Sequence, residues 1–357
     1  MAMSEIGDKR AVENWRHVLS TIGAGREVSG EGIRFAMDQI MSGASGDIQT
    51  ATFAFGLLAK GITAAELDAA AEGMLSFARP VHDPQLAGVI ERGAVDIVGT
   101  GGDGANTVNI STMSMIVIAA SGVPVLKHGN RAASSKSGGA DMLEAFGIDI
   151  ENGLVTSPEH PDFYVRFLFA ARFHPAMRFA GPVRKELAVP TVFNLLGPLT
   201  NPARPQASLI GCAFEDQMET MADTFARRGQ RALVVRGSDG LDEITVTGPT
   251  KVFIVENGEV AEDVIDPHDY GMEYSEIDAL RGGDPAYNAD VARRIWAGEL
   301  EGSIRDAVIL NSAAAIAISR GLGGRPLKEA MADSIEEVKE TLQSGLCLDI
   351  VTAAMKG

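Results

Sequence analysis

The 357 residues of this chain are 45% hydrophobic and carry a formal net charge of −17. This length and composition allow one large or two ordinary domains, whereas the negative charge argues against general nucleic-acid binding. Two cysteines, an N-terminus without a signal-peptide core and no apolar run of bilayer length lead us to expect a cytoplasmic protein with no membrane partner.

Helical patterns fill residues 14–80. The first helix is expected to bury one face with i, i+3, i+4, i+7 spacing, formed by Trp15, Val18, Leu19 and Ile22. Ser29 and Asp47 are candidate N-caps of the second and third helices. Thr63-Ala-Ala-Glu66 is a capping box for a fourth helix that runs toward Pro80. With no strand between them, these helices predict a small helical domain.

From about residue 92 the pattern changes to strand, loop and helix. Apolar runs suited to buried strands occupy residues 95–98, 123–126, 207–212, 232–236 and 252–255. Helices are expected at residues 113–120, 138–146, 215–228, 304–320 and 334–354, and Asn257-Gly258 indicates a hairpin. Because helices alternate with buried strands, we predict an α/β fold with a mixed, mostly parallel central sheet.

Residues 173–202 interrupt the α/β pattern. A basic helical segment that contains Arg184 is followed by a stretch rich in proline and glycine, Asn194-Leu-Leu-Gly-Pro-Leu-Thr-Asn-Pro. We interpret this piece as packing on the N-terminal helices. The expected units are a small helical domain, residues 1–91 completed by about 174–205, and a large α/β domain, residues 92–173 and 206–357. A site between two such domains can close over a ligand.

Two polar, glycine-dense loops each follow a predicted strand and flank the apolar helix. The first runs from Gly99 to Thr112 and offers backbone N–H groups that can turn toward an anion. Ser111 and Thr112 stand where the helix is expected to begin, and a helix start favours phosphate. The second loop adds three cations: Lys127, Arg131 and Lys136. Such a positive cluster on an acidic chain predicts a ligand with more than one phosphate.

A dinucleotide site and purely structural turns are the competing interpretations of these loops. Gly99, Gly101 and Gly104 satisfy the dinucleotide-binding glycine pattern directly after a strand. That site also needs an acidic residue for the ribose near the end of the next strand, where this chain has Lys127. Structural turns leave the clustered cations and hydroxyls unexplained, so phosphate binding is the favoured interpretation.

A third polar element follows the predicted strand at residues 232–236. It places Asp239, Asp242 and Glu243 within five residues. Magnesium takes one or two carboxylates together with phosphate oxygens and water. An acidic surface turn is the plainer interpretation, but beside a polyphosphate site a Mg²⁺ site is favoured.

Together these motifs resemble the anthranilate phosphoribosyltransferase family, from about residue 15 to 355. In family order, the motifs are Gly-Thr-Gly-Gly-Asp-Gly with Asn-Ile-Ser-Thr, Lys-His-Gly-Asn-Arg with Ser-Ser-Lys-Ser-Gly, His-Pro-Ala-Met with Val-Arg-Lys-Glu-Leu, Asn-Leu-Leu-Gly-Pro-Leu-Thr-Asn-Pro and Asp-Gly-Leu-Asp-Glu. The resemblance implies a homodimer and a magnesium-dependent reaction of tryptophan biosynthesis. Phosphoribose passes from 5-phosphoribosyl 1-diphosphate (PRPP) to the amine of anthranilate, which gives N-(5-phosphoribosyl)anthranilate and diphosphate.

The resemblance also implies a role for each matching residue. Those expected at PRPP are Gly99, Gly102, Asp103, Thr107, Asn109, Ile110, Ser111, Thr112, Lys127, His128, Gly129, Asn130, Arg131, Ala132, Ala133, Ser134, Ser135 and Gly139. Those expected at anthranilate are Gly99, Asn130 and Arg184, and those expected at Mg²⁺ are Ser111, Asp242 and Glu243. Gly139 departs from the family, which often has serine at this position.

Displacing diphosphate from the ribose builds positive charge on the sugar ring, so we expect catalysis by positioning and electrostatics. An aromatic amine is neutral at pH 7, and neither His128 nor His174 is assigned as an acid or base. A nucleoside phosphorylase on the same scaffold and a non-catalytic PRPP sensor stay open as alternatives. An oxidoreductase that uses a dinucleotide is disfavoured by Lys127.

Overall fold

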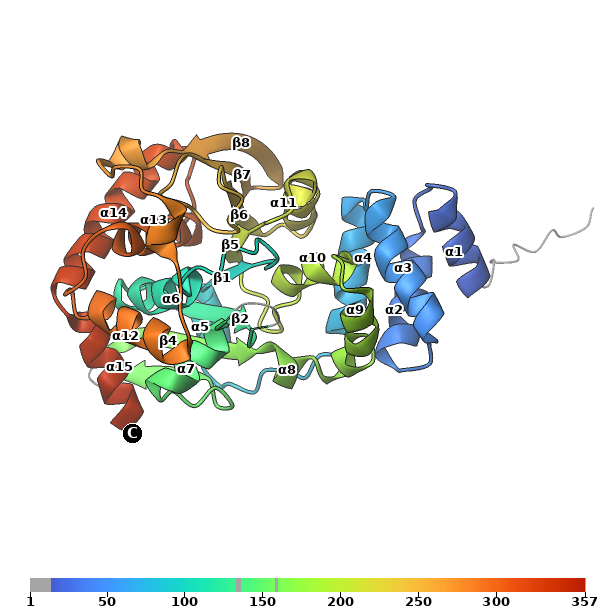
Figure 1. The fold of residues 1–357 in the computed structure, drawn as a ribbon, viewed down its shortest axis with the longest axis horizontal. Coiled ribbons are helices and arrows are strands. Elements are labelled where there is room, and N and C mark those ends of the chain that lie inside the picture. The colour runs from blue at the N-terminus through green and yellow to red at the C-terminus, as the bar shows by residue number, and fades with distance from the viewer. Residues whose placement is uncertain (1–13, 133–135, 158–159, 357) are drawn as a thin grey trace, which may run out of the picture.

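The computed structural model describes residues 14–132, 136–157 and 160–356. Figure 1 shows an elongated molecule in which the N-terminal helices lie at one end and a helix-covered sheet at the other. The N-terminal helices are α1 (Trp15–Gly23), α2 (Gly30–Met41), α3 (Asp47–Ala59) and α4 (Ala64–Leu75). The linker that leaves them contains α5 (Leu86–Glu91).

Local capping sets the starts of the N-terminal helices. Thr63 Oγ1 accepts a hydrogen bond from Glu66 N–H at 3.2 Å, and Glu66 Oε2 accepts one from Thr63 N–H at 3.0 Å, which confirms the predicted capping box. Ser29 caps α2 as expected. The prediction for Asp47 was wrong by one residue: Gly46 is the N-cap, and its N–H donates to Gln49 Oε1.

The chain returns to this helical end after the fourth strand. The returning elements are α8 (Ala170–Phe173), the 3₁₀ helix η1 (Pro175–Arg178), α9 (Gly181–Leu187) and α10 (Val192–Leu199). In Figure 1, α9 lies beside α3, and α10 lies between α4 and the sheet. We propose that residues 174–205 complete a helical domain that begins with residues 1–91, and that residues 92–173 and 206–357 form the α/β domain.

In the described part of the chain, one eight-stranded sheet has the order β3-β4-β2-β1-β5-β6-β7-β8. The strands are β1 (Val95–Gly99), β2 (Val125–Gly129), β3 (Leu154–Ser157), β4 (His160–Phe169), β5 (Ala207–Gly211), β6 (Arg231–Gly237), β7 (Thr250–Glu256) and β8 (Glu259–Ile265). Strands β4, β2, β1, β5 and β6 run parallel, whereas β3, β7 and β8 pair antiparallel. The predicted fold class, helical part plus mixed and mostly parallel sheet, is confirmed.

Helices cover both faces of this sheet. The remaining ones are α6 (Ile110–Ala120), α7 (Gly139–Phe146), η2 (Glu215–Gln217), α11 (Met218–Arg227), η3 (Pro267–Tyr270), η4 (Ile277–Leu280), α12 (Pro285–Trp296), α13 (Ser303–Arg320), α14 (Leu327–Gln343) and α15 (Leu346–Lys356). Helices α6 and α13 pack within the apolar core on one face. The core on the other face is continuous with that of the N-terminal helices, so the two ends of the molecule share buried surface.

Several predicted helix boundaries were wrong. The expected helix at residues 334–354 begins earlier, at Leu327, and is divided into α14 and α15, because Gly345 adopts a left-handed φ of +71° and ends the first helix. The expected helix at residues 215–228 is the 3₁₀ helix η2 followed by α11. Helix α6 begins at Ile110, with Asn109 as N-cap, so Ser111 and Thr112 lie in its first turn. Among the described helices, none combines the length and apolar character that a bilayer-spanning segment needs.

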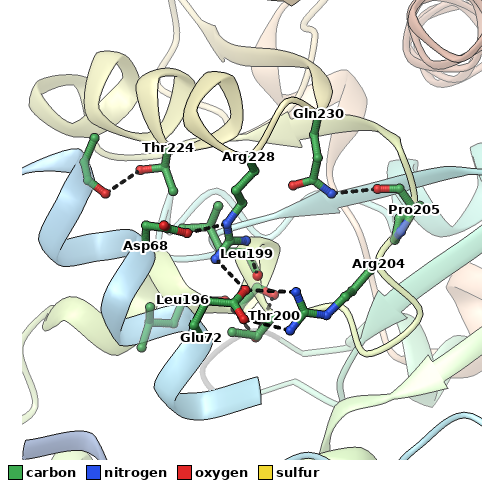
Figure 2. A network of polar contacts seen from close by, with 12 residues as sticks. Asp68, Glu72, Leu196, Leu199, Thr200, Arg204, Pro205, Thr224, Arg228 and Gln230 are labelled. Carbon is green, nitrogen blue, oxygen red and sulfur yellow. Dashed lines mark hydrogen bonds and ion pairs between the residues drawn. The ribbon is translucent and has the colours of Figure 1, made fainter. Parts of the chain in front are cut away.

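A network of polar contacts joins α4 to the end of α11 and to the segment after α10 (Figure 2). Arg228 Nε donates to Asp68 Oδ1 at 2.6 Å, and Arg228 Nη1 donates to the Leu199 carbonyl at 2.8 Å. Arg204 forms a bidentate pair with Glu72 at 2.8 and 3.0 Å. Residues from α4, from the end of α11 and from the segment after α10 therefore meet at one point.

Candidate active site

A cavity of about 550 Å³ opens where the carboxyl ends of β1 and β2 meet the loop after β6. Parallel strands place their carboxyl ends at the same edge, and ligands of α/β sheets bind there. The wall from the α/β part is formed by residues at the ends of β1 and β2, by the loops that follow them, and by Asp242 and Glu243 of the loop after β6. Arg184 of α9 and Asn194 of α10 line the same cavity from the helical side.

The first loop turns sharply through three glycines. Gly101, Gly102 and Gly104 have φ values of +68°, +94° and +71°, a backbone conformation that side chains with a Cβ disfavour. Gly99 needs its small size instead, because a Cβ there would lie 2.2 Å from Asp242 Oδ2. The loop therefore brings backbone N–H groups close to the carboxylate of Asp242.

Asp242 and Glu243 form a partly buried acidic pair beside this loop. Asp242 Oδ2 accepts a hydrogen bond from Gly101 N–H at 2.7 Å, and Glu243 Oε1 accepts one from Ser111 N–H at 3.2 Å. Burial, followed by repulsion from Asp103, raises the pKa of Asp242 to about 7. Burial and repulsion from Asp242 raise the pKa of Glu243 to about 8. The backbone holds both side chains in place, but their negative charges are poorly solvated.

Lys127 supplies the positive charge closest to this acidic pair. Its side chain is buried, and Nζ donates to the Ile97 carbonyl and to Ser111 Oγ, the latter at 3.1 Å. Burial lowers the pKa of Lys127, while attraction to Asp96 and Glu243 opposes that shift. The positive charge of Lys127 thus balances the negative charges of Asp96 and Glu243. Its ammonium group already donates to the Ile97 carbonyl and to Ser111 Oγ.

The acidic pair suits Mg²⁺ better than a metal held by protein alone. Within the described residues, no group of three or more His, Cys, Asp or Glu side chains is arranged to hold a metal ion. Magnesium needs only one or two carboxylates when substrate phosphates and water complete its shell. Two partly buried carboxylates beside one buried ammonium would, when ionised, leave a local negative charge that a divalent cation would neutralise.

His128 and His174 pack edge to face with ring centroids 5.1 Å apart. Burial, followed by repulsion from His174, lowers the pKa of His128 to about 3, and burial lowers that of His174 to about 4. Both rings are therefore neutral at pH 7. Nδ1 of His128 lies 3.0 Å from the Gly197 carbonyl, and Nε2 of His174 lies 2.9 Å from the Thr200 carbonyl. A ring nitrogen facing a carbonyl must carry the proton and donate.

The model of the glycosyl transferase family a/b domain matches residues 91–348, and that of the family's helical bundle domain matches residues 16–78. The anthranilate phosphoribosyltransferase of Corynebacterium jeikeium (strain K411) is 52% identical over 340 residues, 94% of this chain and 90% of the relative. That of Rhodococcus jostii (strain RHA1) is 51% identical over 341 residues, covering 94% and 91%.

The chain belongs to the anthranilate phosphoribosyltransferase family. The crystal structure of the family member from Thermus thermophilus matches with a TM-score of 0.82 and 37% identity, covering 95% of this chain and 98% of that one. The Saccharomyces cerevisiae member, in complex with PRPP and Mg, matches with a TM-score of 0.81 and 25% identity, covering 96% and 97%. Members of this family are pentosyltransferases of tryptophan biosynthesis, as the resemblance implied.

Most residues implied by the family resemblance line this cavity. Those that do so are Gly99, Gly102, Asp103, Thr107, Asn109, Ser111, Thr112, Lys127, His128, Gly129, Asn130, Arg131, Ala132, Gly139, Arg184, Asp242 and Glu243. Ile110 does not: its side chain lies in the core, and its N–H donates to the Val108 carbonyl. Ala133, Ser134 and Ser135 lie outside the described residues. Asp239 lies apart as well, because it accepts hydrogen bonds from the hydroxyls of Thr245 and Thr247.

Two residues that shape the site were not predicted from the sequence. Asp141 Oδ2 accepts from the N–H groups of Ala132 and Gly138, which closes the second loop. Asn288 Nδ2 donates to Asn109 Oδ1 at 2.8 Å and fixes the start of α6. Only the Asp141 contact is local enough to be found from sequence, as the N3 acid of α7.

Proposed function

We propose that this chain transfers phosphoribose from PRPP to the amine of anthranilate, with Mg²⁺ bound at Asp242 and Glu243. The observation that carries the proposal is the partly buried acidic pair at the cavity wall. Its oxygens are hydrogen-bonded by Gly101 and Ser111 at the base of a glycine loop, and Arg184 lies across the same cavity. A metal-dependent diphosphate site and a carboxylate-binding cation are the two elements that this reaction needs.

In this proposal the glycine loop and the second loop bind PRPP. The residues assigned to it are Gly99, Gly102, Asp103, Thr107, Asn109, Ser111, Thr112, Lys127, His128, Gly129, Asn130, Arg131, Ala132, Ala133, Ser134, Ser135 and Gly139, together with the backbone of Ile110. Positive φ at Gly101, Gly102 and Gly104 supports close approach of backbone to phosphate. Mg²⁺ supplies charge neutralisation of the departing diphosphate, and Ser111 completes its protein ligands.

Anthranilate is assigned to Gly99, Asn130 and Arg184. The guanidinium of Arg184 lies over the Phe193 ring, 5.7 Å from its centroid, and faces the cavity. Arginine binds a carboxylate bidentately, which orients the adjacent amine of anthranilate. The neutral amine can attack without prior deprotonation and release its proton to solvent after the new C–N bond forms. The lowered pKa values of His128 and His174 make both rings weak bases, which is consistent with a reaction that uses no histidine as general base.

We further propose that the enzyme is a homodimer and acts in the cytoplasm, as expected from the sequence. The two sides of the cavity come from the proposed helical and α/β domains, so their relative movement would admit and enclose the substrates. Excluding water protects the electron-poor ribose from hydrolysis while diphosphate departs.

The test follows the fluorescence of anthranilate with PRPP and Mg²⁺ present or omitted singly. Turnover should require both, and Asp242→Asn with Glu243→Gln should abolish it because amides lack the charge that holds Mg²⁺. The control is Glu215→Gln with Asp216→Asn, an exposed acidic pair of η2 with the same change in charge. Anthranilate consumption without PRPP, or normal turnover by the first double variant, contradicts the proposal.

A further inference from the structure

Four hydrogen bonds connect residues 197–201 to β1, to β2 and to His174, which follows α8. His128 donates to the Gly197 carbonyl and His174 donates to the Thr200 carbonyl, at 3.0 and 2.9 Å. Asn201 Nδ2 donates to Asp96 Oδ2 at 2.8 Å and to the Leu126 carbonyl at 2.7 Å. The segment is the second half of the Asn194–Pro202 motif, which contributes only Asn194 to the cavity wall.

Asp96 is the carboxylate that accepts hydrogen bonds from both sides of this arrangement. It lies on β1 with no solvent exposure, and its second carboxylate oxygen accepts from His128 N–H at 3.1 Å. Asn201 is 5% exposed, and its Oδ1 accepts from Ala203 N–H at 2.9 Å. One buried carboxylate thus links the backbone of β2 to the chain that leaves α10, and every polar atom of the Asn201 side chain is used.

The other half of the motif reaches the cavity. Within α10, Asn194 lines the cavity wall, and the ring of Phe193 supports the guanidinium of Arg184. Moving the carboxyl end of α10 by a fraction of an ångström would therefore move the support of Arg184 relative to Asn130 of the second loop.

We propose that Asn201, held by Asp96, is a positioning residue that fixes α10 and hence Arg184 against the anthranilate side of the cavity. The inference rests on the proposed function, because it assigns Asn201 to the acceptor half of that site. The glycine loop and the two ends of the second loop are held by Gly101, Ser111 and Asp141 contacts that do not involve α10. Of the PRPP side, the His128 ring does contact α10, through the Gly197 carbonyl. Loss of Asn201 should consequently affect the two substrates unequally.

The first test is Asn201→Ala, which removes the amide without changing charge. The KM for anthranilate should rise about tenfold or more, while the Kd for PRPP with Mg²⁺, measured by calorimetry, stays within about threefold. Amide hydrogen exchange of residues 192–199 should accelerate. The control is Ser319→Ala, which also removes a buried side-chain hydrogen bond, to the Gly93 carbonyl, but far from the cavity. It should lower the Tm and leave the KM unchanged.

Exchanging Asp96 and Asn201 gives a second test, because the double variant keeps the total charge of the wild type. In Asp96→Asn an amide NH₂ group must face either the Asn201 NH₂ group or the His128 N–H. Asp96→Asn with Asn201→Asp restores a donor and an acceptor between positions 96 and 201, although it also turns a carboxylate oxygen toward the Leu126 carbonyl. The double variant should have a lower KM for anthranilate than Asp96→Asn alone. The proposal is overturned if Asn201→Ala weakens both substrates equally or lowers only the Tm. If wild-type enzyme does not consume anthranilate, the proposed function fails, and hydrogen exchange alone then decides whether Asn201 holds α10.

Discussion

Gly99 and Asp242 lie so close that a Cβ on Gly99 would fall 2.2 Å from Asp242 Oδ2. The same oxygen accepts the hydrogen bond from Gly101 N–H. The end of β1 and the loop after β6 are adjacent only in the folded chain, and the missing side chain at position 99 leaves the space that the carboxylate occupies. Glycine at position 99 therefore allows the Asp242 carboxylate to lie against the end of β1 and to accept the hydrogen bond from the loop.

Gly99→Ala is expected to displace the Asp242 carboxylate. Because disturbing groups that orient a metal ligand typically reduces metal affinity about 10–100-fold, we expect Mg²⁺-dependent PRPP binding to weaken by that order. Calorimetry with PRPP at several Mg²⁺ concentrations measures the change. Gly88→Ala in α5, where no atom lies within 4 Å of the added Cβ, is the matched control and should bind normally. Equal binding by both variants would show that Asp242 tolerates the displacement.

The acidic pair should make the metal-free protein less stable as pH rises. Burial raises the pKa values of Asp242 and Glu243 to about 7 and about 8, above the values of about 4 expected in the unfolded chain. The folded state then binds more protons, so its favourable contribution is complete below pH 4 and is lost as pH rises through 7 and 8. Without Mg²⁺, the Tm of the double variant Asp242→Asn, Glu243→Gln should increase relative to the Tm of the wild type as the pH rises from 6 to 9. A pH-independent difference would contradict the shifted pKa values.

Arg184→Ala should weaken anthranilate far more than PRPP. Losing a hydrogen bond to a charged group costs about 1.5–3 kcal/mol, which corresponds to roughly a 10- to 150-fold rise in KM for anthranilate. Arg184→Lys should recover only part of the loss because lysine lacks the planar fork. Lys185→Ala, an exposed neighbour on α9, is the control. Equal losses for both substrates would point to a structural role for Arg184.

Sequence patterns predicted the parts of this fold that are fixed locally. The Thr63–Glu66 capping box and the Asn257-Gly258 hairpin each depend on a few consecutive residues, and both are present in the structure. The glycine loop was recognisable for the same reason. Strand β4 was given no boundaries, because its first residues are polar and the run lacks a continuous apolar pattern.

The supporting contacts of the site could not be predicted in this way. Asn201 and Asp96 are 105 positions apart, and Asn288 and Asn109 are 179 apart. Neither pair belongs to a local motif, since each is created by the sheet order and by the return of α10. The break at Gly345 was missed because both flanking segments have strong helical patterns. Residue types alone indicated what binds, whereas the packing determines which atoms hold the binding groups still.

The network of Figure 2 should contribute to stability very unevenly. The Arg204–Glu72 pair is 56% and 42% exposed, so Arg204→Ala should cost at most about 1 kcal/mol. Arg228 is only 13% exposed and bonds both Asp68 and the Leu199 carbonyl. Arg228→Ala leaves these acceptors unsatisfied and should cost about 1–3 kcal/mol. Urea unfolding of both variants measures the difference, and a larger effect at Arg204 would refute this ranking.

The last prediction concerns Gly139, for which the family resemblance led us to expect serine. A Cβ at this position would lie 2.5 Å from Thr112 Oγ1, and Thr112 is 1% exposed, so the hydroxyl has little room to move. Gly139→Ser should therefore be destabilising by about 1–3 kcal/mol, as overpacking usually is. Thr112→Ala removes the obstructing hydroxyl. The free energy of unfolding of the Gly139→Ser, Thr112→Ala double variant should therefore be higher than the value obtained by adding the two single effects.

A double-mutant cycle from urea unfolding of the four proteins measures this coupling between positions 112 and 139. Because both residues line the cavity, calorimetry with PRPP and Mg²⁺ on the same samples reports whether relief of the clash also restores binding. Strictly additive free energies of unfolding would mean that Thr112 moves aside without cost. In that case its hydroxyl does not explain why this chain has glycine at position 139, and the departure from the family must have another cause.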